Sequence, residues 1–83
     1  MYHIIIEQKV SKEILSLPKN IIQTIFEVVD DLKINPRPVS VKKLLEKDGW
    51  RIRVGVYRIL YTIDDKKKLV IIYRVKHRKD VYR

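Results

Sequence analysis

Residues 50–61 combine arginine, tyrosine and glycine in a pattern that could grip an anion. The run reads WRIRVGVYRILY, in which apolar and basic residues alternate at the period of a β-strand on both sides of Gly55-Val56. A glycine in the first position suits a two-residue hairpin turn. The resulting register pairs Val54 with Tyr57, Arg53 with Arg58, Ile52 with Ile59 and Arg51 with Leu60. Because like charges directly opposite each other destabilise a sheet, we expect these arginines to bind something anionic.

One reaction in which clustered arginines could take part is the cleavage of RNA by its own 2′-hydroxyl group, and its needs can be compared with these residues. This reaction needs a proton acceptor for the hydroxyl, cationic donors for the phosphate oxygens and a proton source for the leaving 5′-oxygen. Arginine suits the second role because its guanidinium stays protonated and can hold two phosphate oxygens at once. It does not suit the first role, because its pKa is too high for it to lose a proton readily.

Other titratable residues offer weaker candidates for acid or base. His77 is a possible acid or base because histidine side chains in general titrate close to neutrality, but strand alternation points it away from Arg78, and a packing role is an equal alternative. Glu46 precedes the hairpin, where a solvated ion pair with nearby lysines is the simpler interpretation. With two histidines, no cysteine and no close carboxylate pair, we expect no metal and no cofactor, and we interpret His3 as a surface residue of an edge strand.

The elements that must position these residues follow from apolar periodicity. Three consecutive isoleucines indicate a strand over residues 2–7. A short helix capped by Ser11 follows, with Val10, Ile14 and Leu17 on one side. A longer helix has Pro18 in its first turn and ends at the Asn35-Pro36-Arg37-Pro38 segment. Its apolar face contains Ile21, Ile25, Val28 and Leu32, widened by Ile22, Phe26 and Val29.

The second half of the chain reads mainly as strands. Residues 41–45 could form a helical turn, and the hairpin of residues 50–61 comes next. Residues 64–68, which include Lys66, Lys67 and Lys68, form a polar turn that could also support RNA binding. Residues 69–73 are apolar at both parities, as in a central strand. The order β-α-α-β-β-β predicts a single-domain α+β sandwich over residues 1–83, with a largely antiparallel sheet and an α-hairpin on one face.

Alternation sorts the side chains of this sheet onto two faces. One set should meet the helices: Ile52, Val54, Tyr57, Ile59, Tyr61 and Ile63. The other set should lie on an uncovered face: Arg51, Arg53, Arg58, Leu60 and Thr62. In the last strand a single parity contains Val70, Ile72, Arg74, Lys76 and Arg78, so its charged half should join the same surface. A cationic sheet face can hold a strand of nucleic acid.

Net charge supports an acidic partner. The 83 residues carry a formal charge of +9, of which residues 49–83 supply +8, with 11 Lys or Arg against 3 Asp or Glu. Such asymmetry favours nucleic acid or an acidic protein as partner, although a solvated basic surface is the simple alternative. No apolar run approaches the length needed to span a bilayer, and no signal peptide is recognisable, so we expect a cytoplasmic protein without membrane contact.

Two blocks of residues resemble RelE-type toxins of the RelE/ParE superfamily. They are WRIRVGVYRILY at 50–61 and HRKDVY at 77–82, about a quarter of the chain. The resemblance implies a ribosome-dependent endoribonuclease that cuts messenger RNA in the ribosomal A site and is inhibited by a cognate RelB-like antitoxin. It also implies that Arg58, Arg78 and Tyr82 are catalytic, with Arg51 and Arg53 as basic support. A phenol among arginines could transfer a proton or stack on a base, although Tyr82 could also be a plain C-terminal anchor.

Two other functions stay open at this point. The resemblance includes ParE-like toxins, which inhibit DNA gyrase by binding and cut no RNA. A plain nucleic-acid-binding module would bind in a salt-sensitive way without cleavage. We expect the toxin itself to be a monomer that forms larger complexes with its antitoxin, and we expect its RNA partners to be the 70S ribosome and messenger RNA.

Overall fold

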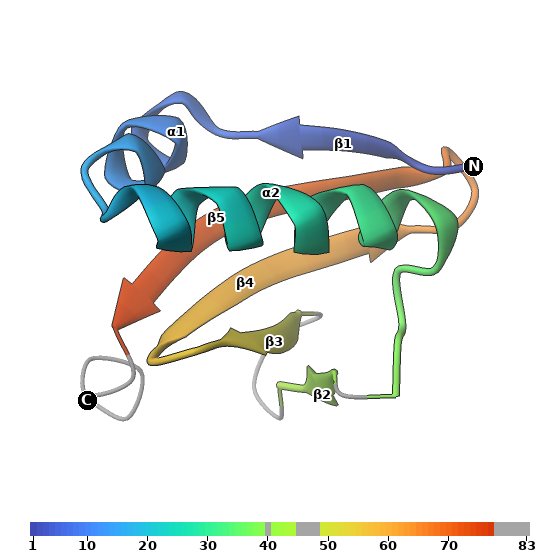
Figure 1. The fold of residues 1–83 in the computed structure, drawn as a ribbon. Helices are drawn as coiled ribbons and strands as arrows, with labels where there is room; N and C mark the ends of the chain where they lie inside the picture. The colour runs from blue at the N-terminus through green and yellow to red at the C-terminus, as the bar shows by residue number, and fades with distance from the viewer. Residues whose placement is uncertain (40, 45–48, 78–83) are drawn as a thin grey trace.

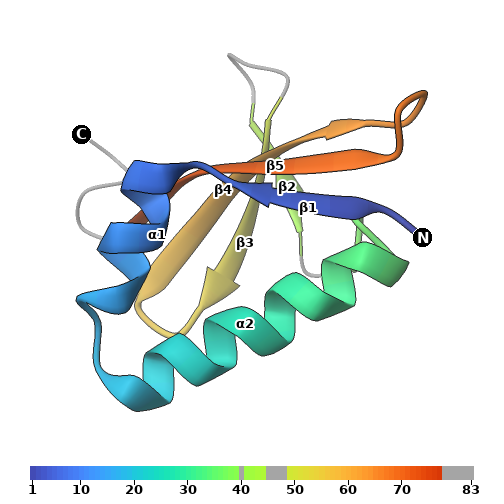
Figure 2. The same cartoon turned by 90° about the horizontal axis from the view of Figure 1, so that it is seen from above.

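The protein folds as two layers, one of helices and one of strands. The computed structural model describes residues 1–39, 41–44 and 49–77. In these residues α1 (Gln8–Leu15) and α2 (Lys19–Ile34) cover the same face of one sheet (Figures 1 and 2). The strands are β1 (His3–Ile6), β2 (Lys42–Lys43), β3 (Trp50–Val54), β4 (Tyr57–Asp64) and β5 (Leu69–His77). This arrangement confirms the predicted α+β sandwich and adds the short strand β2.

The sheet is largely antiparallel, as predicted, with one parallel pair. Its strand order is β1-β5-β4-β3-β2. β1 runs parallel to β5, and each of the other neighbouring pairs is antiparallel. β1 is therefore an edge strand, and His3 on it is exposed, as the sequence predicts. Between these two parallel neighbours the chain passes through both helices and through β2, β3 and β4, which provides the long connection that parallel pairing requires.

The first helix begins earlier than the sequence suggests. Its N-cap position is Glu7, whose N–H donates to the Ile72 carbonyl at 3.3 Å, so the chain turns directly from β1 into α1. The prediction that Ser11 caps this helix is wrong, because Ser11 lies inside it. Val10 and Ile14 are fully buried four residues apart, which is the helical spacing that the sequence shows.

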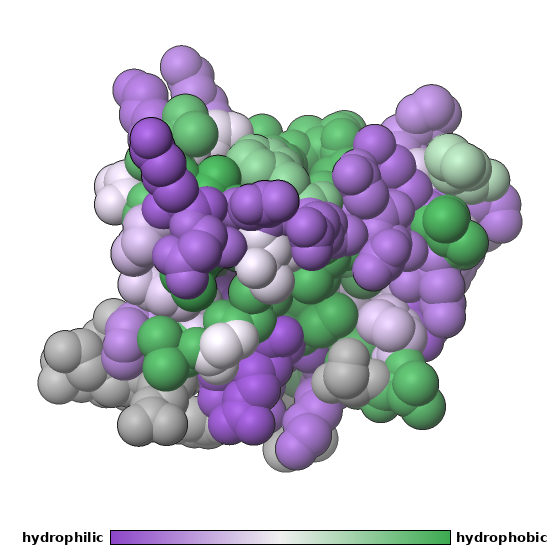
Figure 3. Space-filling model, viewed as in Figure 1, coloured by the Kyte–Doolittle hydropathy of each residue, from purple (hydrophilic) through white to green (hydrophobic). Residues whose placement is uncertain are grey.

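The second helix agrees more closely with its apolar pattern. Pro18 occupies the N-cap position just outside the helix, and its carbonyl accepts the N–H groups of Ile21 and Ile22. The buried residues of the helix are Ile25, Val29 and Leu32. Phe26, predicted as part of the apolar face, is 42% exposed. Successive residues of an α-helix are about 100° apart around its axis, so Phe26 points away from the sheet that Ile25 faces. Hydrophilic side chains cover much of the surface on this side of the molecule, with apolar patches between them (Figure 3).

The central hairpin has the predicted register. β3 and β4 pair Val54 with Tyr57, Arg53 with Arg58, Ile52 with Ile59 and Arg51 with Leu60. Gly55 has φ +59°, a left-handed conformation that a residue with a Cβ adopts only with strain. The turn therefore depends on glycine at this position, and the arginines of the two strands are direct neighbours.

A β-bulge in β5 changes the predicted alternation. Leu60 pairs with Arg74, but the next residue, Tyr61, pairs with Ile72, so Tyr73 is an extra residue. Before the bulge, Val70 and Ile72 are fully buried on the helix side of the sheet. After it, Arg74 and Lys76 pair with Leu60 and Arg58 on the opposite face. The prediction that these four residues share one face is therefore wrong. The prediction that the charged half joins the arginine face is confirmed for Arg74 and Lys76, and Arg78 lies outside the described residues.

The segment before β3 forms a strand in place of the predicted helical turn. Lys42 pairs with Arg51 and Lys43 with Trp50, and the N–H of Leu44 donates to the Gly49 carbonyl at 2.9 Å. Pairing with the edge of β3 satisfies backbone groups that a single helical turn would leave unpaired. Leu45 and Glu46 lie outside the described residues.

The hydrophobic core lies between the helices and the inner face of the sheet. Tyr61 is its largest fully buried side chain, and its hydroxyl donates to the Pro36 carbonyl at 2.7 Å. Gly49 is also buried, and a Cβ there would lie 3.0 Å from the Tyr73 hydroxyl oxygen and 3.1 Å from Leu44 Cδ1. Within the described residues, neither helix has the length and apolar character needed to cross a membrane.

Candidate nucleic-acid interface

Cationic side chains form two rows across the sheet face that points away from the helices. The first row contains Arg53, Arg58 and Lys76, which pair across β3, β4 and β5. The second contains Lys42, Arg51, Leu60 and Arg74, which pair across β2, β3, β4 and β5. The rows are two residues apart along the strands, or roughly 7 Å. Among the residues that the structure describes, six cations from four strands thus occupy one face, which we call the cationic face.

Arg58 lies at the centre of this face and is largely buried. Only 5% of the residue is exposed, which corrects the prediction that Arg58 lies on an uncovered surface. Its strand is flanked by β3 and β5, so Arg53 and Lys76 lie on either side of it. Its guanidinium donates to the Tyr57 carbonyl at 3.2 Å. A buried guanidinium between two like charges is unfavourable for the fold and is well placed to bind an anion.

The neighbours of Arg58 provide access for a larger ligand. Arg53 is exposed, and Arg51, Arg74 and Lys76 are partly exposed. An anion that reaches Arg58 on β4 would therefore also meet cations on β3 and β5. Guanidinium groups donate two parallel hydrogen bonds to a phosphate, so the cationic face has the chemistry to grip a phosphodiester backbone.

An ion pair between Arg37 and Asp65 fixes the segment that leads to β2. Arg37 donates from its two terminal nitrogens to the carboxylate oxygens of Asp65, at 3.1 and 2.8 Å, and the Tyr2 hydroxyl donates to the same carboxylate at 2.7 Å. The hydrogen bond from Arg37 is the main reason that the pKa of Asp65 falls from 3.8 to about 2, with Tyr2 as a second cause. The same hydrogen bond raises the pKa of Arg37.

Trp50, the first residue of β3, packs its ring against Arg37 and so links this ion pair to the sheet. The Arg37 guanidinium carbon lies 5.3 Å from the centre of the Trp50 ring, and Lys43 Nζ lies 5.8 Å from it, both within cation–π range. Together with the buried hydrogen bond from Tyr61 to Pro36, these contacts hold residues 36 and 37 against β3 and β4. Burial of Tyr61 also raises the pKa of its phenol, so it stays a hydrogen-bond donor. The contacts therefore position β3, the strand that presents Arg51 and Arg53.

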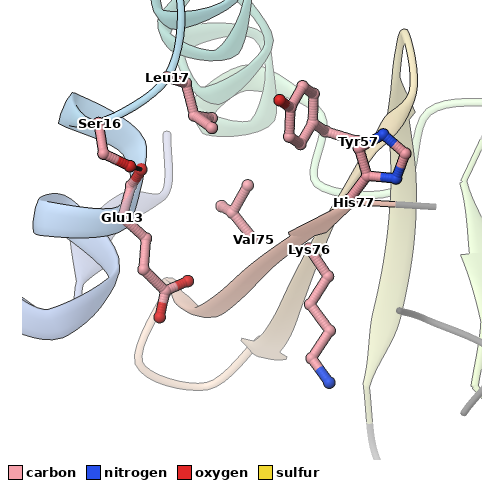
Figure 4. A pocket seen from close by; sticks show the side chains of 7 residues that line it. All are labelled: Glu13, Ser16, Leu17, Tyr57, Val75, Lys76 and His77. Carbon is pink, nitrogen blue, oxygen red and sulfur yellow. Dashed lines mark hydrogen bonds between the residues drawn. The ribbon is translucent and has the colours of Figure 1, made fainter. Parts of the chain in front are cut away.

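A cavity of about 420 Å³ opens where α1, β4 and β5 meet (Figure 4). Glu13, Ser16 and Leu17 line it from the helical layer, and Tyr57, Val75, Lys76 and His77 line it from the sheet. The Tyr57 and His77 rings meet edge to face, with centroids 5.5 Å apart and planes at 79°. His77 pairs with Tyr57 on the helix side, so it does not share the face of Arg58.

Comparison with known proteins identifies the chain. The family model described as the ParE toxin of the type II toxin–antitoxin system parDE matches residues 4–82. The chain belongs to this toxin family. Toxin RelG of Mycobacterium tuberculosis is 38% identical over 74 residues, which is 87% of this chain and 85% of RelG. This similarity makes the chain a RelE-type toxin, as its two sequence blocks predict.

Solved structures of RelE proteins share the fold of this RelE-type toxin. The RelE chain in the crystal structure of the archaeal RelE–RelB complex from Pyrococcus horikoshii has a TM-score of 0.86 and 34% identity, with 93% of this chain and 94% of that chain covered. The isolated RelE toxin of Escherichia coli has a TM-score of 0.81 at 22% identity, with 99% of this chain and 92% of that chain covered, a likeness of fold alone. These matches confirm the predicted RelE-like architecture.

The structure brings together part of the predicted site of the RelE-type toxin. Arg51, Arg53 and Arg58 lie on the same face, in two adjacent rows. Arg78 and Tyr82, the other two predicted catalytic residues, lie outside the described residues. His77 contacts Tyr57 on the opposite side of the sheet, in agreement with the packing alternative. No group of three or more His, Asp or Glu residues gathers in the described part of the chain, and freedom from metal stays a prediction.

Three cations of the cationic face were not among the predicted site residues. Lys76 is the direct neighbour of Arg58, and Arg74 extends the second row. Alternation in the last strand already suggested these two, but the resemblance motifs did not include them. Lys42 joins the second row through β2, which the sequence suggests as a helical turn. Within the described residues, only the pairing with Arg51 places Lys42 on the cationic face. Pairing between segments of this kind leaves no pattern in the local sequence, so it could not be predicted.

Proposed function

We propose that this RelE-type toxin is an endoribonuclease that cleaves messenger RNA in the ribosomal A site and thereby inhibits translation. The observation that carries the proposal is Arg58, buried between Arg53 and Lys76 on one face of the sheet. Such an arrangement is unfavourable in the free protein and becomes favourable when a phosphate enters. A protein that only binds a protein partner would not need a buried arginine such as Arg58 between two other cations.

The proposed chemistry is attack of the 2′-hydroxyl oxygen on the neighbouring phosphorus. The new O–P bond forms as the bond from phosphorus to the 5′-oxygen breaks, which leaves a 2′,3′-cyclic phosphate and a 5′-hydroxyl. The attacking hydroxyl loses its proton, and the leaving oxygen gains one. Arg58, with Arg53 beside it, would donate to the phosphate oxygens as their charge grows.

Arg78 and Tyr82 complete the proposed site by resemblance. Arg78 would be a second donor to the phosphate, and Tyr82 would transfer a proton or stack on a base. The other four cations of the cationic face would hold the flanking backbone, and the ribosome would position the codon. Because ribosomes are cytoplasmic, we place the action of the toxin in the cytoplasm.

A RelB-like antitoxin is the proposed inhibitor. The solved P. horikoshii relative is a complex of RelE with RelB, and the cationic face has the charge to attract an acidic or amphipathic segment. Binding of such a segment over Arg53 and Arg58 would exclude RNA. An antitoxin complex that leaves both arginines accessible to RNA would contradict this part of the proposal.

The test is cleavage on ribosomes programmed with a defined messenger, with the new 5′ ends mapped. Arg58→Ala should slow cleavage by about 10² to 10³-fold, as expected for loss of a transition-state donor. Arg78→Ala and Tyr82→Phe should also slow it, whereas Lys12→Ala, which removes an exposed cation of α1, should cleave like the wild type. Intact messenger in the wild-type reaction overturns the proposal. Gyrase inhibition with intact RNA would then identify a ParE-like toxin, and salt-sensitive RNA binding alone a binding module.

A further inference from the structure

The phenol of Tyr73 lies on the same side of the sheet as the cationic face. Gly49 is two residues before Arg51, and the hydrogen bond from the Leu44 N–H to the Gly49 carbonyl continues the pairing of β2 with β3. Alternation therefore directs the Cβ position of Gly49 to the cationic face. A Cβ built there would lie 3.0 Å from the Tyr73 hydroxyl oxygen and 3.1 Å from Leu44 Cδ1. Both side chains therefore reach this face.

The reach of the Tyr73 side chain shows that its ring lies across the sheet. Tyr73 belongs to β5, whereas Gly49 directly precedes β3, and β4 lies between these two strands. Neighbouring strands are about 4.8 Å apart, so the side chain crosses most of a distance of roughly 10 Å. The ring therefore extends over β4, with one flat side toward the sheet and the other toward solvent. In agreement with this position, Tyr73 is partly exposed.

The surroundings of the Tyr73 ring suit a base on a charged backbone. Arg74 follows Tyr73 directly and belongs to the second cationic row, in which Leu60 pairs with both Arg74 and Arg51. Leu60 is partly exposed and adds apolar surface between these two cations. Burial raises the pKa of the Tyr73 phenol, and the charge of Arg74 opposes this only in part. The phenol is therefore neutral at physiological pH and does not repel a phosphate.

A flat ring beside cations is a general means of binding single-stranded nucleic acid, because bases stack on the ring while the cations hold the phosphates. Tyr73 is three residues, or roughly 10 Å along β5, from Lys76, the partner of Arg58. A nucleotide near a phosphate held at Arg58 can therefore reach the ring. We propose that Tyr73 is a stacking residue for a base of the messenger. The identity of this substrate rests on the proposed function. Since every base has a flat side, the ring would hold the strand without reading its sequence.

Binding can be measured without ribosomes by fluorescence anisotropy at low salt. The probe is labelled 2′-O-methyl hexauridylate, which lacks the attacking hydroxyl and stays intact, and its control is the same backbone without bases. Tyr73→Leu should weaken binding of the probe with bases by at least about fivefold and leave binding of the base-free backbone unchanged. Tyr73→Phe keeps the ring and should bind like the wild type. Phe26→Leu, which removes a ring 42% exposed on α2, should also bind like the wild type.

Three results would overturn the assignment: unchanged affinity in Tyr73→Leu, an equal loss for both probes, or a loss in Tyr73→Phe as large as in Tyr73→Leu. The ratio of the two affinities does not depend on the fraction of folded protein. If circular dichroism shows that Tyr73→Leu does not fold, nuclear magnetic resonance of the wild type decides. The probe with bases should shift the Tyr73 ring signals upfield, and equal shifts with the base-free backbone would refute stacking.

The salt dependence and the ribosome assay separate stacking from the proposed function. The slope of log Kd against log salt should be the same for Tyr73→Leu and the wild type, because the phosphate contacts remain. A shallower slope would show that the substitution disturbs the arginines, and it would overturn stacking. Intact messenger on ribosomes together with the expected probe affinities would overturn the nuclease and leave the stacking residue established. Cleavage by the wild type, with probe affinities unchanged in Tyr73→Leu, would overturn stacking alone.

Discussion

Replacement of Arg58 by methionine should make the protein more stable and inactive at once. Methionine keeps much of the apolar stem and removes the charge. Arg58 is flanked by Arg53 and Lys76, and relief of two like-charge contacts should contribute about 1 kcal/mol. Removal of a guanidinium that is only 5% exposed should contribute about 1 to 3 kcal/mol more. Loss of its hydrogen bond to the Tyr57 carbonyl should cost about 1 kcal/mol.

The net expectation is a gain of about 1 to 3 kcal/mol in the free energy of unfolding. For a domain of this size the melting temperature should rise by at least about 4 °C. Thermal unfolding at low salt, followed by circular dichroism, measures this rise, and the ribosome assay measures the loss of cleavage. Arg53→Met is the matched control, because the exposed Arg53 in the same row should change stability by no more than about 0.5 kcal/mol. An Arg58→Met variant that melts below the wild type would show that the guanidinium supports the fold, and the reasoning for a phosphate clamp would be refuted.

Three further substitutions test the framework behind the site. Because the folded pKa of Asp65 is lowered to about 2, its stabilising contribution is complete above about pH 4 and is lost as the pH falls toward 2. Asp65→Asn should therefore flatten thermal stability over this range, and a curve as steep as that of the wild type would contradict the assignment. Tyr61→Phe removes the buried hydrogen bond to Pro36 and should lower the free energy of urea unfolding by about 1 to 2 kcal/mol. Gly49→Ala should lower it by a similar amount through crowding of the Tyr73 hydroxyl; an unchanged urea midpoint would show that Tyr73 moves aside freely.

The hairpin that forms the centre of the site could be predicted residue by residue. Its register depends on local facts: alternation at period two, a glycine that can adopt positive φ, and a two-residue turn. The core positions of α2 also follow from local periodicity. For these parts, sequence neighbours determine spatial neighbours, so pattern reasoning places Arg51, Arg53 and Arg58 correctly.

The remaining features depend on contacts between segments far apart in sequence. The bulge at Tyr73 forms where β5 pairs with β4 while β1 pairs with its other edge, and the apolar run of residues 69–73 does not indicate which residue is extra. β2 exists through its pairing with β3. The burial of Arg58 likewise depends on its position in a central strand, since alternation predicts a face but not how much of that face is covered.

The bulge also determines where this strand can change length during evolution. With Tyr73 as the extra residue, a chain that lacks it could pair regularly and still keep Arg74 on the outer face and Val75 in the core. A single deletion elsewhere in the strand could be tolerated only if the pairing shifted so that the bulge disappeared. Without that shift, the residues on one side of the deletion would move to the opposite face of the sheet, which would exchange apolar and charged side chains between interior and solvent. Homologues with a β5 shorter by one residue should therefore align with their gap at Tyr73.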